Sequence, residues 1–489
     1  MIAKAPAAET VARAAADLRT RVLRNTGAQM VGRVIIALSR LVVAAIIARM
    51  FGAGTFGEYA LILGLLAIAE WIVDFGTTEV FVREACREPA RERALLRIVT
   101  ALKLVQVPIA FAILAAVILV LRYPGHVVHA GLVAGASLAF YAGVLVYRVI
   151  FKSHLRLERE VAAEFVSVLA MIAMVVAIVR FGGGLAALMA CHVVSRGIFL
   201  VMCIALGRRN FELSVKGVTA RDLKWGAGIS VTIGVIGLLV AVYEMLDVLL
   251  LSKLGTAVEL GYYSGAQRLI WPILLALAAV GGTLYPVAAR HWPADRAQFA
   301  GACQRGLDAV LVLAGIALSS TLAAAEFFLG LLGPELAAGA PALRLLSLLV
   351  FFKAITSTLG PVLYVVHAQR HTLLFIAVAV AMKAVVIAAL ASRFGYLGVA
   401  MGALVVEFFF AVVPTVFLLR LHGGLHLHWT VAAKVAIAIA AAVGCTAYLL
   451  PGASIAAAVV APVVYLALCA ATGALRLADV RLLVRRGAP

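Results

Sequence analysis

Residues 59–81 read YALILGLLAIAEWIVDFGTTEVF, a run of 23 residues whose only charged side chains are Glu70, Asp74 and Glu79. A helix crosses the hydrocarbon layer of a bilayer with about 20 mostly apolar residues, so this run is long enough to span a membrane. It must be helical there, because lipid cannot satisfy exposed backbone polar groups. Its carboxylates also predict a polar neighbour, since a charged side chain at the centre of such a helix costs about 2.5–3.5 kcal/mol.

The same pattern extends over the whole chain, which has 489 residues, 65% of them hydrophobic and 13% charged. Globular proteins are roughly half apolar and a quarter charged, so an ordinary soluble enzyme is excluded. We predict an all-α polytopic membrane protein with about 14 transmembrane helices. The predicted spans are 27–50, 59–81, 98–121, 130–150, 161–179, 185–206, 228–252, 262–285, 307–329, 342–366, 372–391, 399–419, 431–450 and 455–474.

Two short motifs recur six spans apart and indicate an internal repeat. Phe51-Gly52 with Phe56-Gly57 is matched by Leu254-Gly255 with Leu260-Gly261, and Arg180-Phe181-Gly182 is matched by Arg393-Phe394-Gly395. Six is an even number, so we expect two six-helix lobes related by a pseudo-two-fold axis along the membrane normal, with a C-terminal helix pair. The alternative is that these motifs only mark short turns. The predicted boundaries are 1–26 (amphipathic N-terminal segment), 27–206 (N-lobe), 207–227 (linker), 228–419 (C-lobe), 431–474 (helix pair) and 475–489 (basic tail).

Basic residues are distributed very unevenly between alternate connections. One set of connections carries 27 Lys and Arg residues, whereas the other carries only Arg122, Arg180, Lys253 and Arg393. Because cytoplasmic loops are enriched in Lys and Arg, both termini are predicted to be cytoplasmic. The formal net charge of +19 is therefore explained by membrane topology, and we expect no nucleic-acid partner.

Many charged residues nevertheless lie inside the predicted spans, where they cannot face lipid. Pairs spaced by three, four or seven residues share a helix face, and several lie near the midpoints of their spans. We interpret the set as a net cationic central cavity contributed by both lobes. The alternative for each group is a structural ion pair, such as Arg40 with Glu70 or Asp74, or Lys383 with Glu407. Such a cavity could receive the anionic headgroup of a lipid. The candidate residues for binding that headgroup are Arg33, Arg40, Arg196, Arg268, Lys353 and Lys383. The candidates for ion coupling or cavity ion pairs are Glu70, Asp74, Glu244, Asp247 and Glu407.

No cofactor or metal site is predicted. The six cysteines are scattered without a C-x-x-C pair, and the sequence lacks a Walker A motif. His422, His426 and His428 have ligand-like spacing but no nearby Cys or carboxylate, so we do not assign a metal to them. Trp71, Trp271, Tyr243, Tyr262 and Tyr263 are candidates for stacking on sugar rings or for membrane-interface aromatics.

Several motifs resemble one known family. Residues 48–59 (ARMFGAGTFGEY) with Asp74-Phe75-Gly76, residues 261–269 (GYYSGAQRL) with Leu284-Tyr285-Pro286, and residues 395–403 (GYLGVAMGA) are similar to the Wzx-type polysaccharide flippases of the multidrug/oligosaccharidyl-lipid/polysaccharide exporter (MOP) superfamily. The order of the motifs is more specific than any one of them. At residues 53–55 this chain has Ala-Gly-Thr where members often have Gly-Pro-Glu.

The resemblance implies a non-enzymatic flippase of the bacterial inner membrane. It would move an undecaprenyl-diphosphate-linked oligosaccharide from the cytoplasmic to the periplasmic leaflet by alternating access, for lipopolysaccharide or exopolysaccharide export. Arginine suits a diphosphate because its planar guanidinium can bind two oxygens at once.

The chain is expected to act as a monomer, with H⁺ or Na⁺ as a candidate coupling ion and polysaccharide polymerase or chain-length machinery as candidate partners. The alternatives are a cation-coupled multidrug exporter of the same superfamily, a membrane glycosyltransferase or polymerase, and a scaffold without transport; short external loops disfavour an enzyme.

Overall fold

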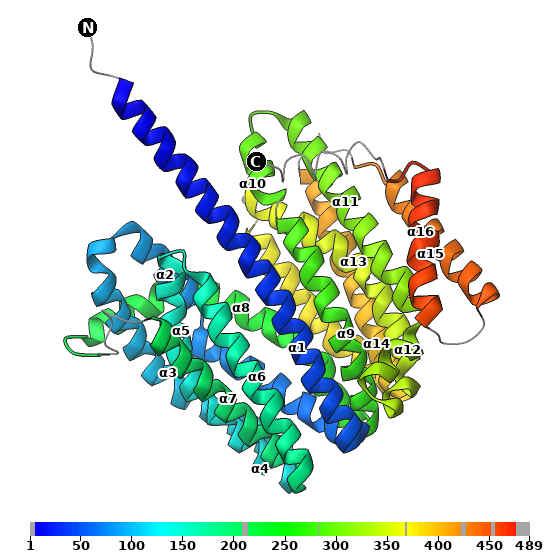
Figure 1. The fold of residues 1–489 in the computed structure, drawn as a ribbon, viewed down its shortest axis with the longest axis horizontal. Helices are drawn as coiled ribbons and strands as arrows, with labels where there is room; N and C mark the ends of the chain where they lie inside the picture. Colours follow the sequence, from blue (N-terminus) through cyan, green and yellow to red (C-terminus); the bar gives the residue numbers. More distant parts are fainter. Residues whose placement is uncertain are drawn as a thin grey trace. The chain divides into compact units, whose positions relative to one another are not determined.

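The computed structural model describes residues 5–207, 214–282, 284–366, 369–421, 427–450 and 455–475. The side chains of residues 5–31, 33, 285, 364, 369, 370 and 421 lie outside this description. Within the described residues every regular element is a helix, as Figure 1 shows. The predicted all-α fold class is confirmed.

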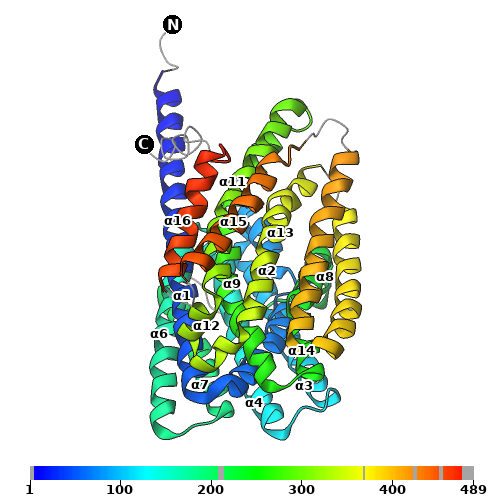
Figure 2. The ribbon, with the colours of Figure 1, turned by 90° about the vertical axis from the view of Figure 1, so that its right-hand side faces the viewer.

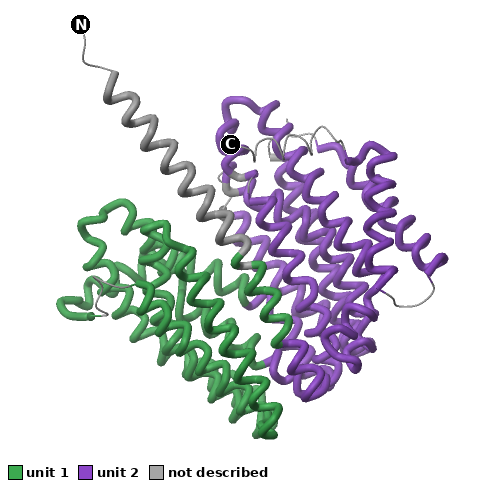
Figure 3. Tube along the Cα trace, in the orientation of Figure 1, with its two compact units in different colours: residues 1–43, 62–241 green, residues 44–61, 242–489 purple. Residues whose placement is uncertain are grey.

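The chain divides into two compact units, coloured separately in Figure 3. Unit 1 comprises Met1–Val43 and Ile62–Ala241, and unit 2 comprises Ala44–Leu61 and Val242–Pro489. The divisions fall inside two helices, α1 (Ala5–Asp74) and α8 (Ala220–Leu254), rather than in loops. Residues 44–61 are therefore counted with helices that follow them by about 200 residues in the sequence.

Unit 1 is a bundle built mainly around α7. Helix α7 packs against α4, α5 and α6, and α3 packs against α4 and α5. A core of Phe81, Val99, Phe151 and Phe199 joins α2, α3, α5 and α7, and each of these side chains is at most 1% exposed. The helices of this unit, besides its parts of α1 and α8, are α2 (Thr77–Arg87), η1 (Pro89–Arg91), α3 (Glu92–Val120), α4 (Gly125–Gly135), α5 (Ser137–Ser153), α6 (Leu157–Phe181) and α7 (Leu185–Leu206).

Unit 2 is organised around α11 and α13, which run alongside each other and beside α14 in Figure 2. Helix α13 also contacts α9, while the C-terminal pair α15 and α16 packs against α11. The helices of this unit, besides its parts of α1 and α8, are α9 (Ala257–Gly282), α10 (Leu284–His291), α11 (Arg296–Ala323), α12 (Ala325–Leu332), η2 (Pro334–Gly339), α13 (Ala340–Val365), α14 (Gln369–Leu421), α15 (Thr430–Leu449) and α16 (Ile455–Ala471).

Eleven helical stretches of the described residues are long and apolar enough to cross a membrane. Two of them, of 54 and 50 residues, are too long for one crossing, because about 20 residues suffice. Each is interrupted by a glycine with positive φ, Gly52 (79°) in α1 and Gly395 (56°) in α14. The chain is thus a multi-pass membrane protein, and its number of crossings agrees approximately with the number of predicted spans.

Two predicted spans are not the continuous helices that hydropathy predicts. The span 59–81 is broken at Phe75 and Gly76, both with positive φ, and the span 307–329 is divided at Ala324 (φ −128°, ψ 35°) between α11 and α12. The span 130–150 lies within one helical stretch, Gly125–Ser153, because Ala136 between α4 and α5 keeps helical dihedral angles (φ −59°, ψ −24°). Hydropathy reports the apolar composition of a run, and it does not detect a local break in backbone geometry inside that run.

The repeated motifs have related backbone roles. Gly182 (φ 74°) and Gly395 (φ 56°), which occupy matching positions, both adopt the left-handed conformations that favour glycine. In the other pair of motifs, a Cβ on Gly57 would lie 2.2 Å from the carbonyl oxygen of Ala257, and one on Gly261 would lie 2.1 Å from that of Ala53. The two motifs therefore pack directly against each other, backbone to backbone, within unit 2.

Candidate functional site

The described charged residues singled out from the sequence fall mainly into two groups, one in each unit. The first cluster, in unit 1, contains Arg40, Glu70, Asp74 and Arg196 together with Lys103, Arg148, Glu160 and Glu164. The second cluster, in unit 2, contains Glu244, Asp247, Lys353, Lys383 and Glu407 together with Tyr243 and Tyr263. The side chain of Arg33 lies outside the described residues.

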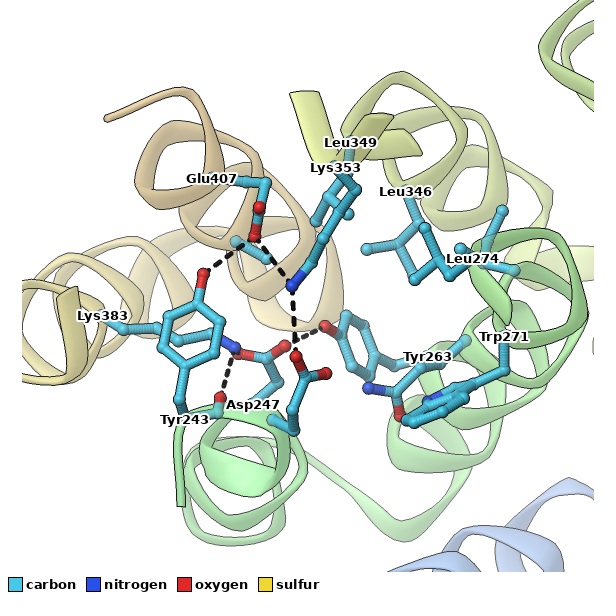
Figure 4. A pocket seen from close by; sticks show the side chains of 14 residues that line it. Tyr243, Asp247, Tyr263, Trp271, Leu274, Leu346, Leu349, Lys353, Lys383 and Glu407 are labelled. Carbon is cyan, nitrogen blue, oxygen red and sulfur yellow. Dashed lines mark hydrogen bonds and ion pairs between the residues drawn. The ribbon is translucent and has the colours of Figure 1, made fainter. Parts of the chain in front are cut away.

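Lys353 of α13 lies between two carboxylates in the second cluster (Figure 4). Its Nζ is 3.1 Å from Oε1 of Glu244 on α8 and 3.3 Å from Oε2 of Glu407 on α14. Glu407 is 1% exposed, so its charge depends on this partner for compensation. The ammonium group thereby joins α8 to the consecutive helices α13 and α14, which follow it by about 100 residues or more.

Lys383 of α14 forms the other ion pair of this cluster. Its Nζ lies 2.9 Å from Oδ1 of Asp247, donates a hydrogen bond of 2.7 Å to the carbonyl oxygen of Tyr243, and lies 4.2 Å from the centroid of the Tyr243 ring. The ammonium group thus contacts an anion, a carbonyl dipole and an aromatic face, all of which stabilise a buried cation.

Two tyrosine hydroxyl groups complete the second cluster. Tyr243 donates to Oε2 of Glu407 at 2.9 Å, and Tyr263 donates to Oδ2 of Asp247 at 2.6 Å. Three carboxylates face two ammonium groups, so the cluster carries one more acid than base. The cavity beside it measures about 40 Å³, enough for water molecules but not for a sugar.

In the first cluster, Glu70 and Asp74 of α1 each have a basic partner. Arg196 of α7 donates to Oε1 of Glu70 at 2.5 Å, and its guanidinium lies 4.9 Å from the centroid of the Tyr141 ring. Lys103 of α3 lies 3.6 Å from Oδ1 of Asp74 and donates to the carbonyl oxygen of Val73 at 2.7 Å. Lys103 is 3% exposed, which makes it one of the most deeply buried cations among the described residues.

Sequence reasoning did not single out Arg148, Glu160 or Glu164. Nε of Arg148 lies 2.5 Å from Oε1 of Glu160, and Nη2 of Arg40 lies 2.5 Å from Oε1 of Glu164. Arg148 and Glu164 lie two and three residues from the ends of predicted spans, where long side chains are expected to reach the membrane surface. The signal that could have identified Arg148 and Glu164 is the presence of charge inside an apolar run, whereas Glu160 directly precedes the predicted span 161–179.

The observed partners differ from those that the sequence offered. Arg40 pairs with Glu164 rather than with Glu70 or Asp74, and Lys383 pairs with Asp247 rather than with Glu407. Residue spacing identifies which residues share a helix face, but it does not identify which helices become neighbours. The guanidinium of Arg268 lies 5.5 Å from the ring centroids of Phe56 and Tyr59.

A cavity of about 440 Å³ adjoins the first cluster. It is formed by α1, α2, α5 and the unit 1 part of α8, and Glu70, Asp74, Arg148 and Lys152 are among its lining residues. Among the described residues, no group of three His, Cys, Asp or Glu side chains is placed to hold a metal ion. His422 and His426 lie outside the described residues, while the backbone N–H of His428 donates to Gln304.

Comparison with known proteins identifies a family. A family model described as "Polysaccharide biosynthesis protein" matches residues 22–292, more than half of the chain. The search of curated protein sequences found no match to this chain.

The fold is shared with solved structures of the MOP superfamily. A structure of the lipid II flippase MurJ in an inward closed conformation has a TM-score of 0.72 at 12% identity, covering 91% of this chain and 98% of that one. An inward-facing multidrug resistance MATE family transporter has a TM-score of 0.64 at 15% identity, covering 80% and 95%. A MOP superfamily transporter from Pyrococcus furiosus has a TM-score of 0.59 at 12% identity, covering 83% and 96%.

Proposed function

Because this chain belongs to the polysaccharide biosynthesis protein family, we propose that it flips an oligosaccharide linked to undecaprenyl diphosphate across the bacterial inner membrane. The substrate moves from the cytoplasmic to the periplasmic leaflet by alternating access and supplies lipopolysaccharide or exopolysaccharide export, as in Wzx-type flippases. The reaction is translocation, so we assign no catalytic residues. The fold shared with a lipid flippase supports the proposal.

The observation that carries the proposal is the set of ion pairs inside helices that cross the membrane. Arg196, Lys353 and Lys383 each contact a carboxylate. A diphosphate can replace that carboxylate, because it offers the same bases a doubly charged set of acceptor oxygens. The bases are thereby kept charged and positioned in an apolar bundle until the headgroup arrives. The proposed headgroup contacts are Arg33, Arg40, Arg196, Arg268, Lys353 and Lys383.

Such an exchange would couple transport to a cation. A carboxylate that loses its basic partner in a buried site is destabilised as an anion, and it recovers neutrality by binding a proton or a sodium ion. The excess of acid over base in the second cluster supports this step. The proposed coupling residues are Glu70, Asp74, Glu244, Asp247 and Glu407.

A second candidate function is a cation-coupled multidrug exporter. The acidic excess of the second cluster and the fold shared with MATE transporters favour it. It predicts that cationic compounds are substrates and that carboxylate variants abolish transport while Arg196 variants do not.

The test is complementation of surface polysaccharide export in a strain that lacks this gene. We expect Arg196→Ala to reduce export about tenfold or more and Arg196→Lys to restore part of it, since lysine keeps the charge but loses the bidentate geometry. Lys434→Ala is the control, because this half-buried lysine of α15 donates to the carbonyl oxygen of Thr472 and belongs to neither cluster. Wild-type export by Arg196→Ala, at equal protein level in the membrane, would contradict the headgroup role.

A further inference from the structure

The 440 Å³ cavity of unit 1 has a lining suited to a ligand. Its volume falls within the roughly 300–1,000 Å³ of small-molecule sites, whereas the cavity of the second cluster is about ten times smaller. Its walls are parts of four helices of one compact unit, α1, α2, α5 and α8.

The charges that line this cavity are already balanced by partners. Glu70 and Asp74 pair with Arg196 and Lys103, and neither of these bases lines the cavity. Arg148 likewise pairs with Glu160, which is not part of the lining, while Lys152 pairs with Glu79 of the lining. The cavity therefore presents hydrogen-bond donors and acceptors side by side without a large net charge. Such a surface suits a neutral ligand with many hydroxyl groups better than a lone anion or cation.

An aromatic surface forms another part of the lining. One region of the Trp71 indole rests on Gly237 of α8, because a Cβ at Gly237 would lie 2.4 Å from a carbon of that ring. Trp71 nevertheless keeps 38% of its surface exposed. The ring is thus held in place and still available to a ligand. A flat apolar face beside paired donors and acceptors matches a sugar ring, which has apolar C–H faces and a rim of hydroxyl groups.

We propose that this cavity of unit 1 binds a sugar ring of the transported glycan. Trp71 stacks on the apolar face of the sugar, Glu70 and Asp74 accept hydrogen bonds from hydroxyl groups, and Arg148 and Lys152 donate them. The assignment rests on the proposed function and adds to it a site for the saccharide, beside the Arg196–Glu70 ion pair where the diphosphate is proposed to bind.

The test compares the binding of three lipids to the purified full-length protein in nanodiscs. One probe is a short-chain polyprenyl diphosphate, and the others are the same lipid carrying one hexose or one N-acetylhexosamine. We expect Trp71→Ala to weaken binding of at least one glycosylated probe about tenfold, which is about 1.4 kcal/mol, and to leave binding of the bare diphosphate unchanged, since only the glycosylated probes have a sugar ring to stack on the indole. Trp225→Ala is a matched control, because Trp225 is also 38% exposed, lies in unit 1 and does not line the cavity.

A second variant distinguishes the loss of the stacking surface from a folding defect in Trp71→Ala. Gly237→Ala keeps the indole but displaces it from α8, and we expect the same selective loss of the glycosylated probe. Equal weakening of all probes, or no weakening of any, would overturn the saccharide site while leaving the flippase proposal intact. Failure of the wild-type protein to bind any probe would instead overturn the proposed function.

Discussion

Lys353 is the residue on which the charge balance of the second cluster depends. It is one cation shared by Glu244 and Glu407, and its side chain is 20% exposed. Removing one member of a buried ion pair is costly because the remaining charge loses its compensation, by about 3–5 kcal/mol.

We therefore expect Lys353→Met to lower the thermal unfolding midpoint of the purified protein and to abolish export. Adding Glu407→Gln removes the more deeply buried of the two acids that lose their partner, while Glu244 stays without its base, so the double variant should regain part of the thermal stability while export stays absent. Differential scanning fluorimetry and the complementation assay measure the two effects. Recovery of export in the double variant would show that Lys353 acts only through packing.

The hydroxyl group of Tyr263 should contribute measurably to stability. It donates to Asp247 at 2.6 Å and is 1% exposed, and a hydrogen bond to a charged group contributes about 1.5–3 kcal/mol. Tyr263→Phe should therefore lower the unfolding midpoint. The neighbouring Tyr262→Phe is the control, because the rings of Tyr262 and Tyr396 form a T-shaped pair with centroids 5.6 Å apart, and this contact survives the change. Equal shifts for both variants would contradict the expectation.

At this scale, the sequence predicted which charges lie inside spans but not their partners. Glu70 and Asp74 stand out because each interrupts an apolar run. Glu70 pairs with Arg196, which lies 126 residues later in the chain, and this pairing depends on how α1 packs in unit 1. The spacing of charges within one helix contains no information about that packing.

At the scale of elements, the close contact between residues 53–57 of α1 and residues 257–261 of α9 depends on glycine. Gly57→Ala would place a methyl group 2.2 Å from a backbone oxygen that cannot rotate away, and overpacking of this kind costs about 1–3 kcal/mol. We expect a lower unfolding midpoint. Gly54→Ala is the matched control on the same helix, since its nearest atoms would be 3.7 Å away, and it should be neutral or slightly stabilising. A neutral Gly57→Ala would show that the two backbones can separate without loss.

Helix positions were largely predictable, because a long, uniformly apolar run can satisfy its backbone hydrogen bonds in lipid only by forming a helix. The predicted spans 185–206 and 342–366 correspond closely to α7 (Leu185–Leu206) and α13 (Ala340–Val365). The breaks at Phe75 and Ala324 were not predicted, because hydropathy averages the composition of a run and does not report the backbone conformation of single residues.

For the whole molecule, the distribution of Lys and Arg makes a prediction about topology. Cys86 is exposed near the end of α2, next to the Arg-rich connection predicted to be cytoplasmic. We expect a membrane-impermeant maleimide to label Cys86 in inside-out vesicles but not in intact spheroplasts. Cys86→Ser provides the background, and Gly183→Cys in that background should show the opposite pattern. Labelling of Cys86 from outside would invert the proposed orientation.

The membership of residues 44–61 in unit 2 has a consequence for biosynthesis. The backbone N–H of Ala53 donates at 2.9 Å to Glu335, which lies 282 residues later in the chain. At roughly 5–20 residues per second, a ribosome needs about 15–60 s to synthesise the chain between these two residues. During this interval the turn at Gly52 lacks its final acceptor, and Gly57 lacks α9 until residues 257–261 emerge. Insertion of the earliest helix therefore precedes its own tertiary assembly, and a nascent chain halted before α9 would leave that turn open to proteases or chaperones.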